Sequence, residues 1–191
     1  MKVVNRWVYV IVGCVALLLS GLVYAWSVLS GPIAAEFPQW SAAQLSLTFT
    51  IVMSFFCIGG LVGGFLAGKV SQKVYLWVSA ALFLVGFLLS ANIRSLAMLY
   101  IGFGVICGFA SGFSYNAVLA TVGKWFPDKQ GLISGILLMG FGISSFLIGK
   151  LYQVCTPDAI GAWRRSFIVL GVVSAVVMAI CGFFLEKPGK D

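Results

Sequence analysis

The sequence predicts an all-α membrane protein whose six transmembrane helices form two inverted three-helix repeats. Three observations lead to this fold class. Of the 191 residues, 61% are hydrophobic and 9% are charged, whereas soluble domains carry about 45–50% apolar and about 25% charged residues. Six apolar stretches reach the roughly 20 residues that a helix needs to cross the hydrocarbon core. A weak internal similarity also relates the first three stretches to the last three.

The predicted helices belong to one six-helix bundle, a single domain over residues 1–191, and cover about 7–29, 42–67, 74–92, 97–122, 131–153 and 165–185. Gly and Pro inside them are acceptable because membrane helices contain more of both than soluble helices. Lys2 and Arg6 before the first stretch resemble the start of a signal peptide. No small-residue cleavage site follows before a polar segment, so we expect a retained helix.

Lysine and arginine in the connections predict the orientation, because cytoplasmic loops carry an excess of both. With the N-terminus inside, eight cations lie on the cytoplasmic side, namely Lys2, Arg6, Lys69, Lys73, Lys124, Lys129, Lys187 and Lys190. Four then lie outside, namely Arg94, Lys150, Arg164 and Arg165. We therefore expect a multi-pass protein of the cell (inner or plasma) membrane with both termini in the cytoplasm. The cations form no continuous stripe, so the net charge of +7 does not indicate a nucleic-acid partner.

The internal similarity consists of three matches in the same order. Residues 20–24 (SGLVY) match residues 111–115 (SGFSY), Phe37-Pro38 matches Phe126-Pro127, and residues 65–69 (FLAGK) match residues 146–150 (FLIGK). Each copy contains three helices, and an odd number of crossings inverts the second copy. Inverted three-helix repeats are typical of secondary transporters. Chance similarity between Gly-, Ser- and Phe-rich helices is the alternative.

Polar and small residues form a stripe on one face of the first helix and of the fourth. Ser20, Tyr24, Ser27 and Gly31 make the first stripe, and Gly104, Gly108, Ser111 and Tyr115, with Asn116 beside them, make the second. Hydroxyls facing lipid would be costly, so both stripes should face the bundle interior. Tyr24 and Tyr115 are then candidate walls of a substrate cavity, with Asn116 and Ser27 nearby. The alternative is that these groups hydrogen-bond across a packed helix interface.

The charged residues limit the chemistry. All five acids fall in loops or the tail, so the sequence gives no carboxylate in a span for proton or sodium coupling. Lys150, near the outer end of the fifth helix, is a candidate anion contact at the cavity mouth, and snorkelling to the interface is the alternative. The five cysteines are scattered and there is no histidine. We therefore expect no metal, no cofactor and no enzymatic activity.

The connection between the second and third helices carries a family resemblance. Residues 64–73 (GFLAGKVSQK) resemble the signature loop of the major facilitator superfamily, G-x-L-A-D-R-x-G-R-K, and Gly64, Lys69 and Lys73 occupy positions of that conformational loop. The Asp of the family pattern is Gly68 here, and its second Gly is Ser71. The resemblance implies half of a twelve-helix fold.

A narrower resemblance is to the oxalate/formate antiporter family. Residues 124–135 (KWFPDKQGLISG) are similar to its K-W-F-P-x-K/R-x-G-x-x-x-G segment between helices four and five. Further support comes from residues 24–27 (YAWS) and from Trp163-Arg164. Related monocarboxylate carriers share part of this pattern. The resemblance implies exchange of small mono- or dicarboxylates by alternating access, with Tyr24 and Tyr115 at the substrate site.

The resemblance places the substrate-binding cations in a second six-helix half. We therefore expect three partners: the lipid bilayer, a small carboxylate substrate, and a second half that is either another chain or a second copy in a homodimer. A truncated or split gene is a further explanation of the length. The competing function is an accessory or truncated membrane protein with no transport activity of its own.

Overall fold

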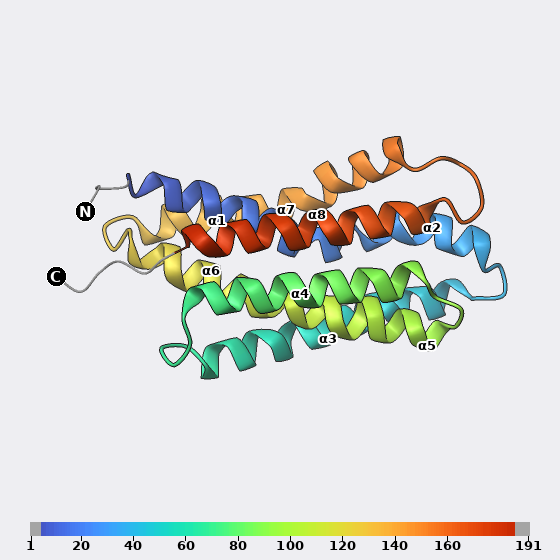
Figure 1. Ribbon diagram of the computed structural model, residues 1–191, viewed down its shortest axis with the longest axis horizontal. Helices are drawn as coiled ribbons and strands as arrows, with labels where there is room; N and C mark the ends of the chain where they lie inside the picture. Colours follow the sequence, from blue (N-terminus) through green and yellow to red (C-terminus); the bar gives the residue numbers. More distant parts are fainter. Residues whose placement is uncertain (1–4, 186–191) are drawn as a thin grey trace.

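In the computed structural model, residues 5–185 are described and form an elongated bundle of helices without strands (Figure 1). The first span consists of α1 (Trp7–Ser20), η1 (Gly21–Ala25) and α2 (Trp26–Glu36), and the fourth consists of α5 (Leu96–Leu99), η2 (Tyr100–Cys107) and α6 (Gly108–Lys124). Each of the other spans is a single helix. The second is α3 (Ala42–Phe65), the third α4 (Gln72–Ala91), the fifth α7 (Gln130–Cys155) and the sixth α8 (Trp163–Phe184). All six are long and apolar enough to cross a membrane. The expected fold class of six transmembrane helices is confirmed.

Two sets of connections lie at opposite ends of the bundle. The loops at 66–71 and 125–129 lie at the end where α1 begins and α8 finishes, which we call the terminal end (Figure 1). The three remaining loops lie at the far end. Lys2, Lys187 and Lys190, on which the orientation prediction partly depends, lie outside the described residues. The cytoplasmic assignment of the terminal end stays a prediction.

The first span is longer than the sequence pattern suggests. It was expected to end near residue 29, at the Ser-Gly-Pro sequence, but α2 continues through Pro32 to Glu36. Proline removes one backbone hydrogen bond from a helix and usually ends it. Membrane helices tolerate proline because neighbouring groups satisfy the freed carbonyl. The longer helix carries Glu36 to the far end of the bundle.

Two spans depart from regular α-helix, and the sequence did not predict either departure. The first span tightens into a 3-10 helix at Gly21–Ala25, and the fourth widens into a π-helix at Tyr100–Cys107. Such segments often mark functional positions in helices. Tyr24 lies within the tightened segment, so its direction depends on a geometry that α-helical spacing does not give.

The packing follows the inverted repeat. The second span packs along the fourth, the fifth packs along the first, and the third pairs with the sixth. Exchanging the first three spans for the last three reproduces these pairings. Glycines allow the closest approaches: a Cβ added at Gly21 would overlap the carbonyl oxygen of Phe141, and one at Gly112 would overlap that of Phe56.

These glycine contacts also correct the register of the repeat. Phe56 and Phe141 are 85 residues apart, whereas the FLAGK and FLIGK letters matched in the sequence are 81 residues apart. The difference is about one helical turn. The equivalence of the second and fifth spans therefore follows backbone packing rather than the matched letters.

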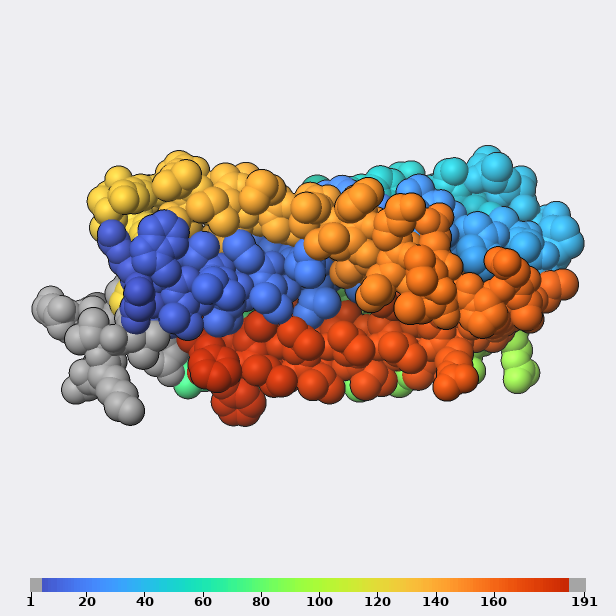
Figure 2. All heavy atoms as spheres, turned by 90° about the horizontal axis from the view of Figure 1, so that it is seen from above, coloured from blue at the N-terminus to red at the C-terminus, as the bar shows by residue number. Residues whose placement is uncertain are grey.

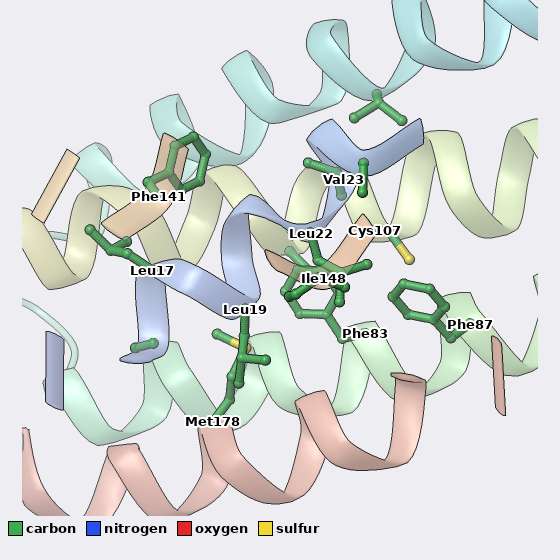
Figure 3. Close-up of a cluster of buried hydrophobic side chains, with 14 of the residues drawn as sticks. Leu17, Leu19, Leu22, Val23, Phe83, Phe87, Cys107, Phe141, Ile148 and Met178 are labelled. Carbon is green, nitrogen blue, oxygen red and sulfur yellow. The ribbon is translucent and has the colours of Figure 1, made fainter. Parts of the chain in front are cut away.

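The core is built around the first span. Leu17, Leu19 and Leu22 of this span meet side chains from α4, α7 and α8, among them Phe83, Ile148 and Met178 (Figure 3). Leu17 and Leu22 are completely buried. In contrast, α3 and α7 keep much of their surface uncovered. The first and fourth spans are thus central, and the second and fifth flank them.

At the terminal end, the segment between the fourth and fifth spans is fastened to the start of the first. Arg6 donates two hydrogen bonds to the Asp128 carboxylate, at 2.9 and 3.2 Å. Tyr9 stacks on Trp125 with ring centroids 4.2 Å apart, and Phe126 is fully buried with Trp7 against its edge. The residues that resemble the antiporter-family segment therefore have a structural role here.

At the far end, Arg164 joins the first, third and sixth spans. It donates to Glu36 at 2.6 Å and to the carbonyl oxygens of Ala91 and Ile93 at 2.9 and 3.2 Å. The indole N–H of Trp163 donates to the second Glu36 oxygen at 2.6 Å. Charge-assisted bonds of this kind are about twice as strong as neutral ones. We call this group of residues the far-end cluster.

Candidate functional site

Tyr24 and Tyr115 meet at one phenylalanine. The ring centroid of Phe141 in α7 lies 5.2 Å from Tyr24 and 4.9 Å from Tyr115. Phe49 and Phe56 of α3 border the same group, at 5.9 Å from Tyr24 and 5.4 Å from Tyr115 respectively. Tyr24 is 36% exposed and Tyr115 is partly exposed. We call this surface, with Asn116, the tyrosine face.

The serines that precede the two tyrosines set their direction. Ser111 donates to the carbonyl oxygen of Ser20 at 2.6 Å, and the Ser20 and Ser114 hydroxyls are 2.7 Å apart. All three serines are fully buried and tie the first span to the fourth. With this part of each stripe turned into the interface, the tyrosines beyond it emerge on the surface. Neither tyrosine hydroxyl has a hydrogen-bond partner among residues 5–185.

A groove of about 640 Å³ runs beside Tyr115 between α3 and α6. It is lined by Phe56, Cys57, Gly60, Leu61, Gly64, Phe65, Tyr115 and Asn116. The Asn116 amide donates to the Gly60 carbonyl at 3.0 Å, which holds its side chain along the groove wall. A Cβ at Gly60 would lie 2.7 Å from the Asn116 amide nitrogen, so a larger residue there would displace this side chain.

The other two predicted substrate contacts lie elsewhere. Ser27 is exposed and lines a second cavity of about 630 Å³ between α2 and the end of α7. Lys150 is exposed on α7, nine residues beyond Phe141. At about 100° per residue this separation places the two side chains on opposite faces of the helix. The structure thus brings together Tyr24, Tyr115 and Asn116, but neither Ser27 nor Lys150.

The conformational loop keeps its predicted position at the terminal end. Gly64 is exposed near the end of α3, and Lys69 lies in the turn that follows. Lys73 lies in the first turn of α4. Gly68 has a φ of +87°, in the left-handed region that glycine adopts without strain. The residue at the family's Asp position therefore gives the turn a shape that a carboxylate-bearing residue would adopt only with strain.

The tyrosine face offers rings and hydrogen-bonding groups, but no charge. None of the residues lining its groove is an acid or a base. Phenol hydroxyls donate to carboxylate oxygens, and the Asn116 amide adds a further polar group. Such a surface can orient a small anion, but full charge neutralisation requires a cation from another element.

The sequence did not identify the aromatic partners of the two tyrosines. Phe56 and Phe141 are two of 16 phenylalanines, and nothing in an apolar helix separates a site-lining ring from a packing ring. The repeat contains a signal that could have identified these two phenylalanines. Gly21 and Gly112 directly precede the site in each copy, and their closest neighbours are these two phenylalanines.

Comparison with known proteins finds relatives that match most of the chain. The family model for the Major Facilitator Superfamily matches residues 11–191. Over 183 residues the chain is 29% identical to the uncharacterized MFS-type transporter YhjX of Escherichia coli, covering 96% of this chain and 44% of that protein. It is 25% identical to the oxalate:formate antiporter of Oxalobacter formigenes, covering 98% of this chain and 44% of that protein.

Two further comparisons extend the pattern. Monocarboxylate transporter 13 of Rattus norvegicus is 27% identical over 88% of this chain and 39% of its own length. The inward-open structure of the xylose transporter XylE of Escherichia coli superposes with a TM-score of 0.78 at 18% identity, covering 96% of this chain and 49% of that one. This structural match shows the fold alone. The chain spans less than half the length of these relatives.

Proposed function

The chain belongs to the major facilitator superfamily, and from that premise we propose that it is the N-terminal half of a transporter of small organic anions. The substrates we propose are mono- or dicarboxylates, moved by alternating access in an exchange like that of oxalate and formate. The observation that carries this proposal is the convergence of Tyr24 and Tyr115, from equivalent positions of the two repeats, on Phe141.

The chemistry of the tyrosine face supports a carboxylate. Two phenol hydroxyls without protein partners are available as donors, and each hydrogen bond to a charged acceptor contributes about 1.5–3 kcal/mol. The relatives named as carrying oxalate, formate or monocarboxylates favour the same class. Asn116 is part of this proposed site, and Ser27 would lie along the route, in the cavity between α2 and the end of α7. Lys150, on the opposite face of α7 from Phe141, would lie outside the site.

A second six-helix half completes the proposal. The groove supplies no cation, so a carboxylate bound there needs one from outside these six spans. The uncovered surface of α7 supports close docking of the second half. At Gly131, Gly135 and Gly142, no atom lies within 4 Å of the position that a Cβ would occupy. Small residues along one face let transmembrane helices approach closely. We propose that the second half, in another chain or a second copy, covers this surface in the cell membrane.

The loop with Gly64, Lys69 and Lys73 is proposed to act during alternating access at the cytoplasmic side. Gly64 has no neighbour within 4 Å of a built Cβ, so a helix of the second half has room there. With Gly68 in place of the family's Asp, the closing contact would depend on the two lysines rather than on an acid. Both chain ends would then face the cytoplasm.

The proposal is tested by reconstitution. The purified chain is placed in liposomes alone, and together with a second half expressed from the coding sequence downstream of it. Uptake of radiolabelled oxalate, formate and lactate is measured against internal substrate. We expect exchange only when both halves are present. Exchange by the chain as a purified monomer would contradict the requirement for a second half.

Two observations favour the alternative of an accessory protein without transport activity. The groove has no charge, and the signature loop lacks its acid. Two tests would favour this alternative. Two differently tagged copies of the chain would fail to co-purify, and the downstream coding sequence would encode no six further spans with arginine or lysine in the membrane.

A further inference from the structure

A third cavity, separate from the tyrosine face, opens where α7 leaves the bundle. Toward the far end the last turns of α7 diverge from α8 (Figure 1). The space between them measures about 420 Å³ and is lined by Leu151, Tyr152, Cys155, Pro157, Gly161, Ala162, Arg165, Ser166, Val169 and Leu170. We call it the α7–α8 crevice. The end of α7 and the start of α8 lie on the same face of the molecule (Figure 2).

The walls of the crevice continue into surface that suits lipid. Leu151 and Val154 of α7 are 63% and 81% exposed, and Val169 of α8 is 52% exposed. Exposed apolar side chains on membrane spans contact acyl chains. In a membrane, the part of the crevice between these side chains would open toward hydrocarbon.

One unpaired cation stands among these apolar walls. Arg164 is bonded to Glu36 and two carbonyl oxygens, but its neighbour Arg165 has no carboxylate partner among the described residues. Arg165 occupies the first turn of α8, and the ends of membrane spans carry cations whose charged heads reach the interface with water. The loop acid Asp158 lines the cavity beside Ser27 rather than this crevice. A guanidinium with free donors matches the geometry of a phosphate.

The crevice also contains a buried hydroxyl without a partner. Tyr152 is 4% exposed, and its hydroxyl oxygen makes no hydrogen bond in the described part of the chain. Burying such a group unsatisfied costs free energy. Tyr152 lines both this crevice and the cavity beside Ser27. The other hydroxyls at this level, Thr156 and Ser166, satisfy each other at 2.8 Å.

We propose that the α7–α8 crevice binds an anionic phospholipid. Its phosphate pairs with Arg165, one acyl chain fills the apolar space between α7 and α8, and the Tyr152 hydroxyl donates to an ester or phosphate oxygen of the glycerol end. Basic pockets between membrane helices select anionic headgroups in this way. The lipid would hold the diverging end of α7 against α8. This binding does not depend on the proposed transport.

The first test measures lipid retention. The purified chain in a non-ionic detergent is mixed with phosphatidylglycerol or phosphatidylcholine of the same acyl chains, and bound lipid is counted by native mass spectrometry. We expect several-fold more bound phosphatidylglycerol. Arg165→Gln should remove this preference. Arg94→Gln, which removes another cation of the far end outside the crevice, should keep it. Equal binding of the two lipids, or an unchanged preference in Arg165→Gln, would overturn the proposal.

The second test reports on the crevice itself and on the acyl chain. Cys155 lines the crevice, and Cys57→Ser removes the exposed cysteine of the tyrosine groove. In this background, phosphatidylglycerol should slow labelling of Cys155 by a maleimide several-fold. Glycerol phosphate, which has the anion without chains, should not. Equal slowing by glycerol phosphate would show that the crevice binds the free anion, and it would overturn the proposal of a lipid site. Unchanged labelling with phosphatidylglycerol would place the lipid elsewhere.

Discussion

Tyr24 and Tyr115 stand 91 residues apart in the sequence, yet their rings lie 5.2 and 4.9 Å from the same phenylalanine ring, that of Phe141. The buried serine contacts between the first and fourth spans bring the tyrosines to this position. The inverted repeat thus produces a pair of hydroxyl-bearing rings on one face. This pair is the basis of the proposed carboxylate site.

The far-end cluster predicts a stability effect at Glu36. In Glu36→Gln the guanidinium of Arg164, whose side chain is 30% exposed, loses its charged partner. The glutamine amide has one acceptor oxygen for the two donors, the Arg164 guanidinium and the Trp163 indole, so one part-buried donor loses its partner, which costs about 1–3 kcal/mol. The thermal midpoint in detergent, followed by circular dichroism, should fall by several degrees. Arg6→Gln breaks the more exposed pair at the terminal end and should cause a smaller fall. A larger fall in Arg6→Gln would contradict the prediction.

The contact between Arg6 and Asp128 predicts a pH dependence. The hydrogen bonds from Arg6 lower the pKa of the Asp128 carboxyl below its ordinary value, which is about 3.9. A lowered folded-state pKa stabilises the fold above about pH 3.9, and this contribution is lost as the pH falls through the lower value. Carbon NMR of labelled aspartate should show the pKa rising in Arg6→Gln.

The matched control for this titration is Lys129→Gln. Lys129 lowers the pKa of Asp128 only as the smallest of its causes. Its removal should therefore raise the pKa less than removal of Arg6 does. An equal rise in both variants would mean that general positive charge, rather than the Arg6 hydrogen bond, sets the pKa.

The close helix contacts predict which glycines tolerate a methyl group. Gly21→Ala and Gly112→Ala place a Cβ against the backbone carbonyls of Phe141 and Phe56, so the helices must separate. Overpacking of this kind costs about 1–3 kcal/mol. Both variants should melt earlier than the unmodified chain. Gly135→Ala, with no atom within 4 Å, should melt unchanged. Equal melting of all three would contradict the packing.

The uncovered glycines of α7 predict a separate effect on assembly. Gly135→Leu should leave the folding of this chain unaltered, because no atom lies near that position. It should weaken co-purification with the second half if that half docks on α7. Val176→Leu, on the exposed surface of α8, is the control and should not weaken it. Normal co-purification of Gly135→Leu would exclude docking at these glycines.

Much of the fold could be predicted from the sequence because hydrocarbon imposes strict requirements. Apolar stretches of the required length predict six spans, and the three ordered matches predict an inverted repeat of three helices. The end of the first span was wrong, because Pro32 indicates a break in a soluble helix. The tightened turn at Gly21–Ala25 and the widened one at Tyr100–Cys107 depend on packing that local sequence does not encode.

The site could be predicted only in part. Tyr24 and Tyr115 stood out because each lies in a polar stripe and at the matching position of the repeat. Phe141 did not, because a phenylalanine looks the same whether it faces a core or a cavity. The serines of the same stripes turned inward, since Ser111 bonds to the backbone of Ser20. Glu36 and Arg164 were 128 residues apart, and no spacing rule connects them.

The most direct test of the proposed function is carboxylate exchange by the two tyrosine variants. Proteoliposomes containing the chain and its second half are loaded with oxalate or formate, and the initial rate of uptake of labelled substrate is measured. Loss of a hydrogen bond to a charged group costs about 1.5–3 kcal/mol. Tyr24→Phe and Tyr115→Phe should therefore each slow exchange about 10-fold or more, while Tyr9→Phe, at the terminal end, should exchange normally. Unchanged exchange in both Tyr24→Phe and Tyr115→Phe would contradict the carboxylate site.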